Sequence, residues 1–153
     1  MSEAKTGNSG DPRPATGGSR GFSAAERAAM RERARELKVE ASRASGEADL
    51  AAAIEKMREP DRTIANRVHD VIRAAAPELA SKTWYGMPAY VKDGNVICFF
   101  QNAGKFGARY QTLGFNDRAH LDDGSMWPTA FAIQELSPKE EARITALIKK
   151  AVS

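Results

Sequence analysis

The spacing of the apolar residues changes twice along this chain, near Lys82 and near Ser137, and these changes limit the folds that it can adopt. Before Lys82 the apolar residues recur at intervals of three and four, which is typical of amphipathic helices. After Lys82 they alternate with polar residues, and β-branched and aromatic residues become frequent, as in strands. From Ser137 the helical spacing returns. This order predicts a two-layer α+β fold, in which helices pack on one face of an antiparallel sheet.

Three helices are predicted before the strands. The first begins at Ser23, whose hydroxyl can form a capping box with Glu26, and Gly46 is expected to end it. A shorter helix follows, and Pro60 suits the first turn of a third, which Pro77 stops. The apolar stripe of the first helix consists of Met30, Ala34, Leu37 and Ala41.

Two turn signals join the predicted strands. Asp93 and Gly94 suit a two-residue hairpin, because both tolerate the positive φ that a type I′ turn requires. A second hairpin is predicted at residues 102–104. After the last strand, Ser137 and Glu140 form a second capping box that begins a C-terminal helix. The predicted strands are 82–85, 87–92, 95–101, 105–112 and 129–136.

The length and composition predict one domain and a tail. The chain has 153 residues, of which 42% are hydrophobic and 28% charged, close to the averages of globular proteins. Residues 1–21 are rich in Gly, Ser, Thr and Pro and contain almost no large apolar side chain, so we expect a disordered tail. Residues 22–153 are expected to form a single α+β domain.

The lone cysteine, Cys98, lies in an apolar run, so we expect it to be buried and unreactive. One cysteine forms no intramolecular disulfide, which favours a reducing compartment. The first 21 residues lack the apolar core of a signal peptide, and no run of residues is apolar and long enough to cross a bilayer. We therefore expect a cytoplasmic protein without a membrane partner.

The net charge of +3 does not favour a nucleic-acid partner. Along the first helix, basic residues alternate with glutamates, which is typical of a solvated helix with compensating charges. A nucleic-acid-binding surface would instead gather its basic residues on one face.

A loop after the fourth strand brings together a histidine and two carboxylates, His120, Asp122 and Asp123. Imidazole and carboxylate groups are ligands that metal ions accept. The spacing fits no established motif, and Asp122, Asp123 and Gly124 also suit a simple turn, so both interpretations stay open.

Aromatic residues next to glycine and proline form the other candidate site. Glycine and proline allow the chain to turn or bulge beside large rings, which can shape a pocket or a sheet corner. Tyrosine and tryptophan combine an apolar body with a polar group, so these rings are candidates for contacting a small ligand or a protein partner, and packing in the core is the alternative interpretation. The candidates are Trp84, Tyr85, Met87, Tyr90 and Trp127.

The same residues carry a family resemblance. The runs 84–90 (Trp-Tyr-Gly-Met-Pro-Ala-Tyr), 92–100 and 126–131 (Met-Trp-Pro-Thr-Ala-Phe) resemble the YdhG-like domain family over about residues 48–152. The resemblance implies a frataxin-like fold, which is a twisted antiparallel sheet with helices packed on one side. At least one bacterial member of the family is regarded as an intracellular iron chaperone, so the resemblance implies iron as a candidate cofactor or cargo.

Iron binding of the frataxin type would use exposed acidic residues. The nearest acid-rich segment of this chain is 47–61, in which basic residues interrupt the acids. A solvated helix surface is the alternative interpretation of this segment. The acids are Glu47, Asp49, Glu55, Glu59 and Asp61.

No sequence motif of a common enzyme class is present: there is no nucleophile elbow, zinc-binding helix, Cys-x-x-Cys pair or phosphate-binding glycine loop. The sequence therefore predicts a non-enzymatic binding or interaction protein of YdhG-like fold, with an iron chaperone of frataxin type as the alternative.

Overall fold

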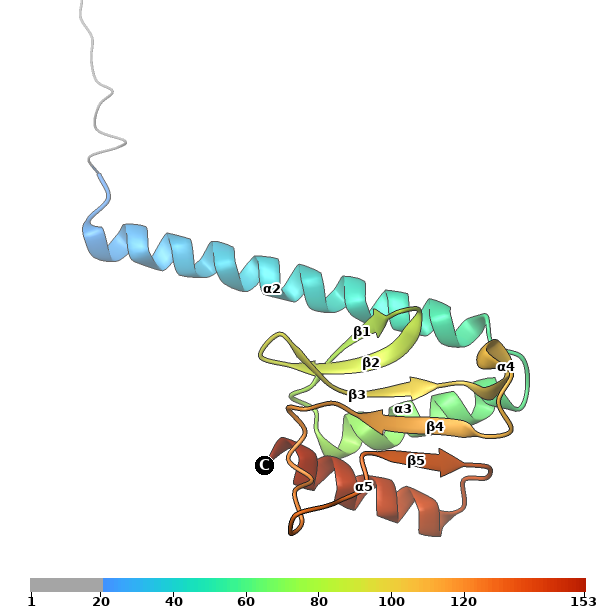
Figure 1. Cartoon of the computed structure of the whole chain (residues 1–153). Coiled ribbons are helices and arrows are strands. Elements are labelled where there is room, and N and C mark those ends of the chain that lie inside the picture. Colours follow the sequence, from blue (N-terminus) through green and yellow to red (C-terminus); the bar gives the residue numbers. More distant parts are fainter. Residues whose placement is uncertain (1–20) are drawn as a thin grey trace, which may run out of the picture. The chain divides into compact units, whose positions relative to one another are not determined.

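The computed structural model describes residues 21–153, and the predicted tail, residues 1–21, lies outside the described residues except for Gly21. Within the described residues no helix has the length and apolar character needed to cross a membrane. In chain order the elements are α2 (Ala24–Glu55), α3 (Asp61–Ala75), β1 (Ala80–Trp84), β2 (Met87–Lys92), β3 (Asn95–Gln101), α4 (Ala103–Phe106), β4 (Gln111–Phe115), β5 (Ala130–Ile133) and α5 (Pro138–Val152) (Figure 1).

The chain divides into two compact units, residues 1–40 and residues 41–153, so the boundary falls within helix α2. The described part of the first unit, residues 21–40, exposes all of its side chains. Met30 and Leu37 of the predicted apolar stripe are 47% and 49% exposed. The sheet, the core and the pocket described below belong to the second unit.

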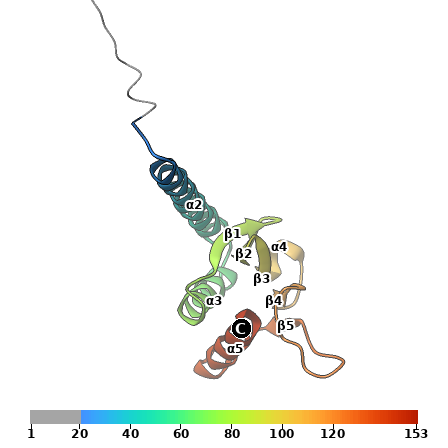
Figure 2. The same ribbon diagram turned by 90° about the vertical axis from the view of Figure 1, so that its left-hand side faces the viewer.

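The sheet has five antiparallel strands in the order β1-β2-β3-β4-β5, which confirms the predicted α+β fold. Helices α3 and α5 lie on the same side of this sheet (Figure 2). The predicted turn at Asp93 and Gly94 is confirmed, because both residues have positive φ, 51° and 79°. A second turn of the same kind joins β1 to β2 at Tyr85 and Gly86, whose φ angles are 51° and 76°.

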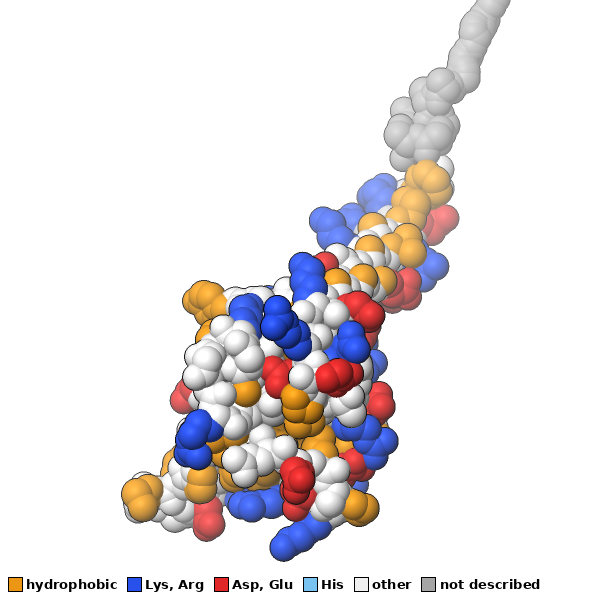
Figure 3. All heavy atoms as spheres, turned by 90° about the vertical axis from the view of Figure 1, so that its right-hand side faces the viewer, with side chains coloured by type: hydrophobic (Ala, Val, Ile, Leu, Met, Phe, Trp, Pro, Cys, Tyr) orange, Lys and Arg blue, Asp and Glu red, His pale blue; other side chains and the backbone are white. Residues whose placement is uncertain are grey.

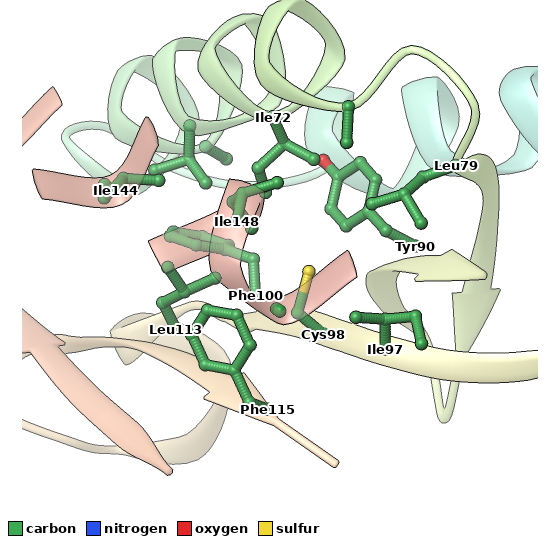
Figure 4. Close-up of a cluster of buried hydrophobic side chains, with 14 of the residues drawn as sticks. Ile72, Leu79, Tyr90, Ile97, Cys98, Phe100, Leu113, Phe115, Ile144 and Ile148 are labelled. Atoms are coloured by element: carbon green, nitrogen blue, oxygen red, sulfur yellow. The ribbon is translucent and has the colours of Figure 1, made fainter. Parts of the chain in front are cut away.

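The core lies between the sheet and its helices. Figure 4 shows isoleucines of α3 and α5 facing Tyr90, Cys98 and Phe100 of β2 and β3. Cys98 is fully buried, as predicted, and burial raises the pKa of its thiol far above the ordinary value. The capping box of Ser137 and Glu140 at the start of α5 is also confirmed.

The prediction that Gly46 ends the first helix is wrong, and so is the separate second helix. Helix α2 continues through Gly46 to Glu55. Gly46 is buried in the helix, and a Cβ atom there would overlap the backbone oxygen of Ser81 in β1. This glycine therefore serves a close helix–strand contact, which a local sequence signal does not distinguish from a helix end.

The predicted strand 105–112 and the hairpin at 102–104 are also wrong. Residues 103–106 form the single-turn helix α4, which ends at Gly107 in the left-handed region, with φ of 64°. Strand β4 begins only at Gln111. The cause is a set of hydrogen bonds to the distant Asp61, described below.

Candidate binding pocket

A pocket of about 750 Å³ opens in the second unit, where the end of α2, the start of α3, the β1–β2 turn and α4 come together. Figure 3 shows the side of the molecule that carries these elements, with basic and acidic side chains close to one another. Five charged residues line the pocket: Asp49, Lys56, Arg58, Asp61 and Lys105. We call it the Asp61 pocket.

Asp61, the first residue of α3, is 7% exposed, and neutral groups hold its carboxylate. The Gly104 N–H of α4 donates to Oδ2 at 2.8 Å, and Nδ2 of Asn102 donates to the same oxygen at 3.2 Å. Nε2 of Gln111 donates to Oδ1 at 2.8 Å. A buried carboxylate needs such partners, and here donors from three positions after β3 provide them.

These hydrogen bonds explain the path of the chain after β3. Gln111 uses its other amide atom, Oε1, to accept the Ala103 N–H at 2.7 Å. Gln111 and Asp61 thus accept the first two backbone N–H groups of α4, those of Ala103 and Gly104, so the chain begins a helical turn there instead of extending as a strand. The same bonds join the start of α3 to the start of β4.

Two opposing effects set the pKa of Asp61. Burial raises the pKa, but the hydrogen bonds from Gly104, Gln111 and Asn102 favour the charged form, and the net result is a pKa below the ordinary value. Asp61 is therefore ionised at neutral pH.

Three cationic side chains surround the pocket: Lys56, Arg58 and Lys105. In the part of the chain that the structure describes, none of the three forms an ion pair. Nζ of Lys105 lies 3.4 Å from the backbone oxygen of Tyr85 and 5.5 Å from the centre of the Phe106 ring. The positive charge of Lys105 is thus held between the β1–β2 turn and α4, at the edge of the pocket.

Tyr85 is the most exposed of the predicted aromatic candidates, with 80% of its surface in solvent. It precedes Gly86, which lines the pocket. Its ring meets Trp84 edge-on, with 4.9 Å between the ring centres, and Trp84 in turn lies 5.2 Å from Phe99. Tyr85 and the half-buried Trp84 therefore pack together, and neither residue lines the pocket.

The remaining aromatic and apolar candidates lie elsewhere. Met87 and Tyr90 are buried, at 6% and 1% exposure. The Tyr90 hydroxyl lies 2.8 Å from Nδ1 of His69, within hydrogen-bond distance. Trp127 is half-buried and packs against the core. These three side chains are therefore packed within the protein. The hydroxyl of Tyr90 has a polar partner there, His69.

The acids of the segment 47–61 have separate surroundings. Asp49 and Asp61 line the pocket, whereas Glu55 is exposed outside it. Glu47 approaches Nε2 of His69 at 3.5 Å. Glu59 accepts hydrogen bonds from the backbone and side chain of Thr63 and from Arg62.

The loop candidates His120, Asp122 and Asp123 are all exposed. Nδ1 of His120 lies 2.8 Å from the backbone oxygen of Ser153, and its backbone N–H donates to Ala151. Across residues 21–153, no three His, Cys, Asp or Glu side chains are grouped so that they could hold a metal ion.

Sequence reasoning missed most of this pocket. Its cations and the side chains that hold Asp61 come from segments far apart in the chain, and no local motif connects them. The missed residues are Lys56, Arg58, Asn102, Lys105 and Gln111.

Comparison of the chain with models of protein families, with curated proteins and with solved structures gave no match.

Proposed function

We propose that the second unit is a non-enzymatic binding module, and that a small anionic ligand occupies the Asp61 pocket. The observation that carries this proposal is the group of three cationic side chains without ion-pair partners among the described residues, Lys56, Arg58 and Lys105, around one concave site. Cations that are not neutralised by the protein itself attract anions and raise their local concentration.

The charges of the pocket support an anion rather than a cation. Its lining contains three basic and two acidic side chains. Of the two acids, Asp61 already accepts three hydrogen bonds from the protein. Asp49 is exposed, as are the three cations, so it offsets one positive charge and the exposed part of the lining keeps a net positive charge.

The size of the pocket supports a small molecule. Its volume of about 750 Å³ falls within the range of roughly 300–1,000 Å³ that is typical of sites for small ligands and cofactors. The wall formed by Ala52 and Ala53 of α2 and by Met57, which follows the helix, provides apolar surface beside the charges.

The proposal is tested by amide NMR of the labelled protein titrated with ribose 5-phosphate, a small anion without an aromatic ring. We expect the largest shifts at the amides of Gly86, Gly104 and Lys105. The control is a titration with the uncharged sugar ribose, for which these amides should not move. The proposal is wrong if ribose 5-phosphate leaves the three amides unmoved.

An Fe(II) titration under anaerobic conditions examines the family-based iron hypothesis separately, with Mg²⁺ as its control. Shifts within residues 47–61 or 120–123 that Fe(II) causes and Mg²⁺ does not cause would favour iron binding. Part of the segment 47–61 also lines the pocket, so shifts at Glu47, at Glu55 or within residues 120–123, which lie outside the lining, distinguish iron binding from anion binding.

A further inference from the structure

We propose that the free edge of strand β5 binds an extended peptide of a partner protein, which joins the sheet as a further antiparallel strand. The peptide places apolar side chains in a groove between β5 and α5 and an acidic side chain at Arg143. This site shares no residue with the lining of the Asp61 pocket. The inference is carried by the unpaired backbone groups of β5, by the groove beside them and by the charge of Arg143.

The two edges of the sheet differ. At the β1 edge, α2 crosses the strand, and a Cβ atom on Gly46 would overlap the backbone oxygen of Ser81. Strand β5 is the other edge, and within residues 21–153 it pairs only with β4. It contains neither a charged residue nor a proline, two of the features by which edge strands commonly avoid further pairing. This edge is therefore open to another strand.

The register of β4 and β5 shows which backbone groups of β5 face outward. The N–H of Phe115 donates to the backbone oxygen of Thr129, so these two residues form a hydrogen-bonded pair. Such pairs alternate along an antiparallel ladder, so Phe131 also bonds to β4, whereas Ala130 and Ala132 direct their N–H and C=O groups away from it. Both alanines are exposed, and no hydrogen bond within the described chain satisfies these outward groups. Two donors and two acceptors are therefore available to an added strand.

A groove of about 260 Å³ lies beside this edge, between β5 and α5, which are neighbours in both ribbon views (Figure 1, Figure 2). Apolar side chains line most of it, among them Phe131 and Ile133 of β5 and Ile144 and Leu147 of α5. Every second side chain of a strand points to the same face of the sheet. A peptide with apolar residues at every second position therefore fits both the backbone edge and the groove, as in known cases of recognition by strand addition.

The size of the groove favours a peptide over a second copy of the chain. Nine residues line it, whereas a stable protein–protein interface uses roughly 20–30 residues on each side.

The charges at the groove favour an acidic peptide. The guanidinium of Arg143, which also lines the groove, lies 5.5 Å from the centre of the Phe131 ring and forms no ion pair with any described residue. Glu140 lines the groove as well, but its carboxylate accepts hydrogen bonds from Ser137 in the capping box of α5. An acidic residue of the peptide would therefore complement Arg143.

The probe is the peptide acetyl-Asp-Thr-Val-Thr-Val-Thr-Asp-amide, in which aspartate and valine share one face of the strand and threonine has the other. Opposite residues of an antiparallel ladder share a face, so the threonines should pair with Ala130 and Ala132. N-methylation of the first two threonines removes backbone donors from the pairing edge, and N-methylation of the two valines is the matched control. The labelled full chain is titrated with each peptide, and amide shifts and hydrogen exchange are measured.

We expect saturating peptide to slow the hydrogen exchange of the Ala130 and Ala132 amides about tenfold or more. The threonine-methylated peptide should bind about tenfold or more weakly than the parent, and the valine-methylated peptide as tightly. In the protein, Ala132→Pro should abolish binding, because it removes an outward N–H that β4 does not use. Ala132→Val keeps this N–H and should bind normally. The methylated peptides are compared on the wild type, so their result does not depend on the folding of the proline variant.

The charge is tested with asparagine in place of both aspartates of the peptide. This change should weaken binding about two- to fivefold in the wild type and have no effect in Arg143→Gln. Equal binding of the two peptides to the wild type overturns the assignment of an acidic partner.

Three results overturn the strand addition itself. The first is unchanged exchange of Ala130 and Ala132 at millimolar parent peptide. The second is equal binding of the two methylated peptides, because the groove would then hold side chains without adding a strand. The third is a shift of the same two amides that grows with protein concentration in the absence of peptide, which would make a second copy of the chain the occupant of the edge.

Discussion

Helix α2 crosses strand β1 so closely at Gly46 that a Cβ atom on this residue would overlap the backbone oxygen of Ser81. The contact joins backbone to backbone, so no side-chain movement can relieve an added methyl group. It fixes the end of α2 next to the strand that leads into Tyr85, and the same end of the helix forms one wall of the Asp61 pocket.

Replacing Gly46 with alanine therefore tests this contact. In an open helix the change would stabilise the protein by about 1 kcal/mol, because alanine has the higher helix propensity. At Gly46 we expect a loss of about 1–3 kcal/mol of unfolding free energy, from overpacking against the backbone of Ser81. Denaturant unfolding measures the difference, and Ser45→Ala at the exposed neighbouring position should cost nothing. A Gly46→Ala variant as stable as the wild type would contradict the close contact.

Asp61→Asn tests the hydrogen bonds that fold the α4 turn. The amide nitrogen of asparagine would face donors that now bind a carboxylate oxygen, so we expect a loss of about 2–3 kcal/mol at neutral pH. The native pKa of Asp61 is lowered, so the stability that its charge provides is present above the unfolded pKa of about 4 and is lost as the pH falls through the native pKa. Acid unfolding curves should therefore be less steep for Asp61→Asn than for the wild type below about pH 4. Equal curves would show that Asp61 does not hold the turn as a carboxylate.

His69 should make the stability depend on pH in a different range. Burial lowers its pKa, and the repulsion by Arg73 adds to this effect, so that together they outweigh the attraction of Glu47 and Asp70. Nδ1 lies 2.8 Å from the hydroxyl of Tyr90. The pKa of this histidine in the unfolded chain is about 6.5. Below this pH the unfolded chain binds a proton at His69, whereas the folded protein, with its lower pKa, stays neutral there until the pH falls further. Stability should thus fall as the pH drops below about 6.5 and level off below the native pKa.

The check is the titration of the His69 ring by NMR, together with denaturant unfolding between pH 7 and pH 5. We expect a ring midpoint below that of an exposed histidine, and a smaller loss of stability in His69→Gln. A midpoint above the ordinary value would mean that Glu47 dominates, and stability would then rise on acidification.

Tyr85→Asn tests the backbone strain of the β1–β2 turn. Asparagine tolerates the left-handed region, so relief of strain is expected to stabilise the hairpin by about 1 kcal/mol, apart from the lost contact with Trp84. Thermal unfolding measures the change. Marked destabilisation by Tyr85→Asn would instead give the ring a structural role.

Most of the fold could be predicted, because its signals are local. The Asp93-Gly94 turn and the Ser137 capping box each depend on a few consecutive residues, and both are confirmed. Strands β2 and β3 have the predicted bounds, since alternating apolar residues limited by turn residues define them. The α+β class follows from the order of these elements.

The errors occurred where a distant residue decides the local structure. Glycine is a residue type that often ends helices, so the sequence predicts a helix end at Gly46. Only the close approach of the Ser81 backbone explains why a glycine lies inside the helix at this position. The residues after Asn102 alternate between apolar and polar like a strand. However, the backbone N–H of Gly104 donates a hydrogen bond to Asp61, which lies 43 residues earlier in the chain, and a helical turn forms instead. Hydrogen bonds of this kind leave no periodic pattern in the sequence.

The candidate site was predicted only in part for the same reason. Gly86 and Pro88 mark the turn beside the pocket in the sequence. Asp61 stands out in the sequence only as one of a run of acids, and the alternating pattern predicts for Lys105 a strand that does not form. Their proximity depends on the packing of α2, α3 and α4, which periodicity does not describe.

The most direct test of the anion site is the affinity for ribose 5-phosphate of a Lys56→Gln, Lys105→Gln double variant, measured by calorimetry at low salt. The matched control is Lys149→Gln, Lys150→Gln, which removes the same charge from the exposed end of α5. The account predicts at least a tenfold loss of affinity in the pocket variant and less than a twofold change in the control, since a lost charge-assisted contact costs about 1.5–3 kcal/mol. Equal losses in the two variants would mean that the anion responds only to net charge, and the Asp61 pocket would not be its site.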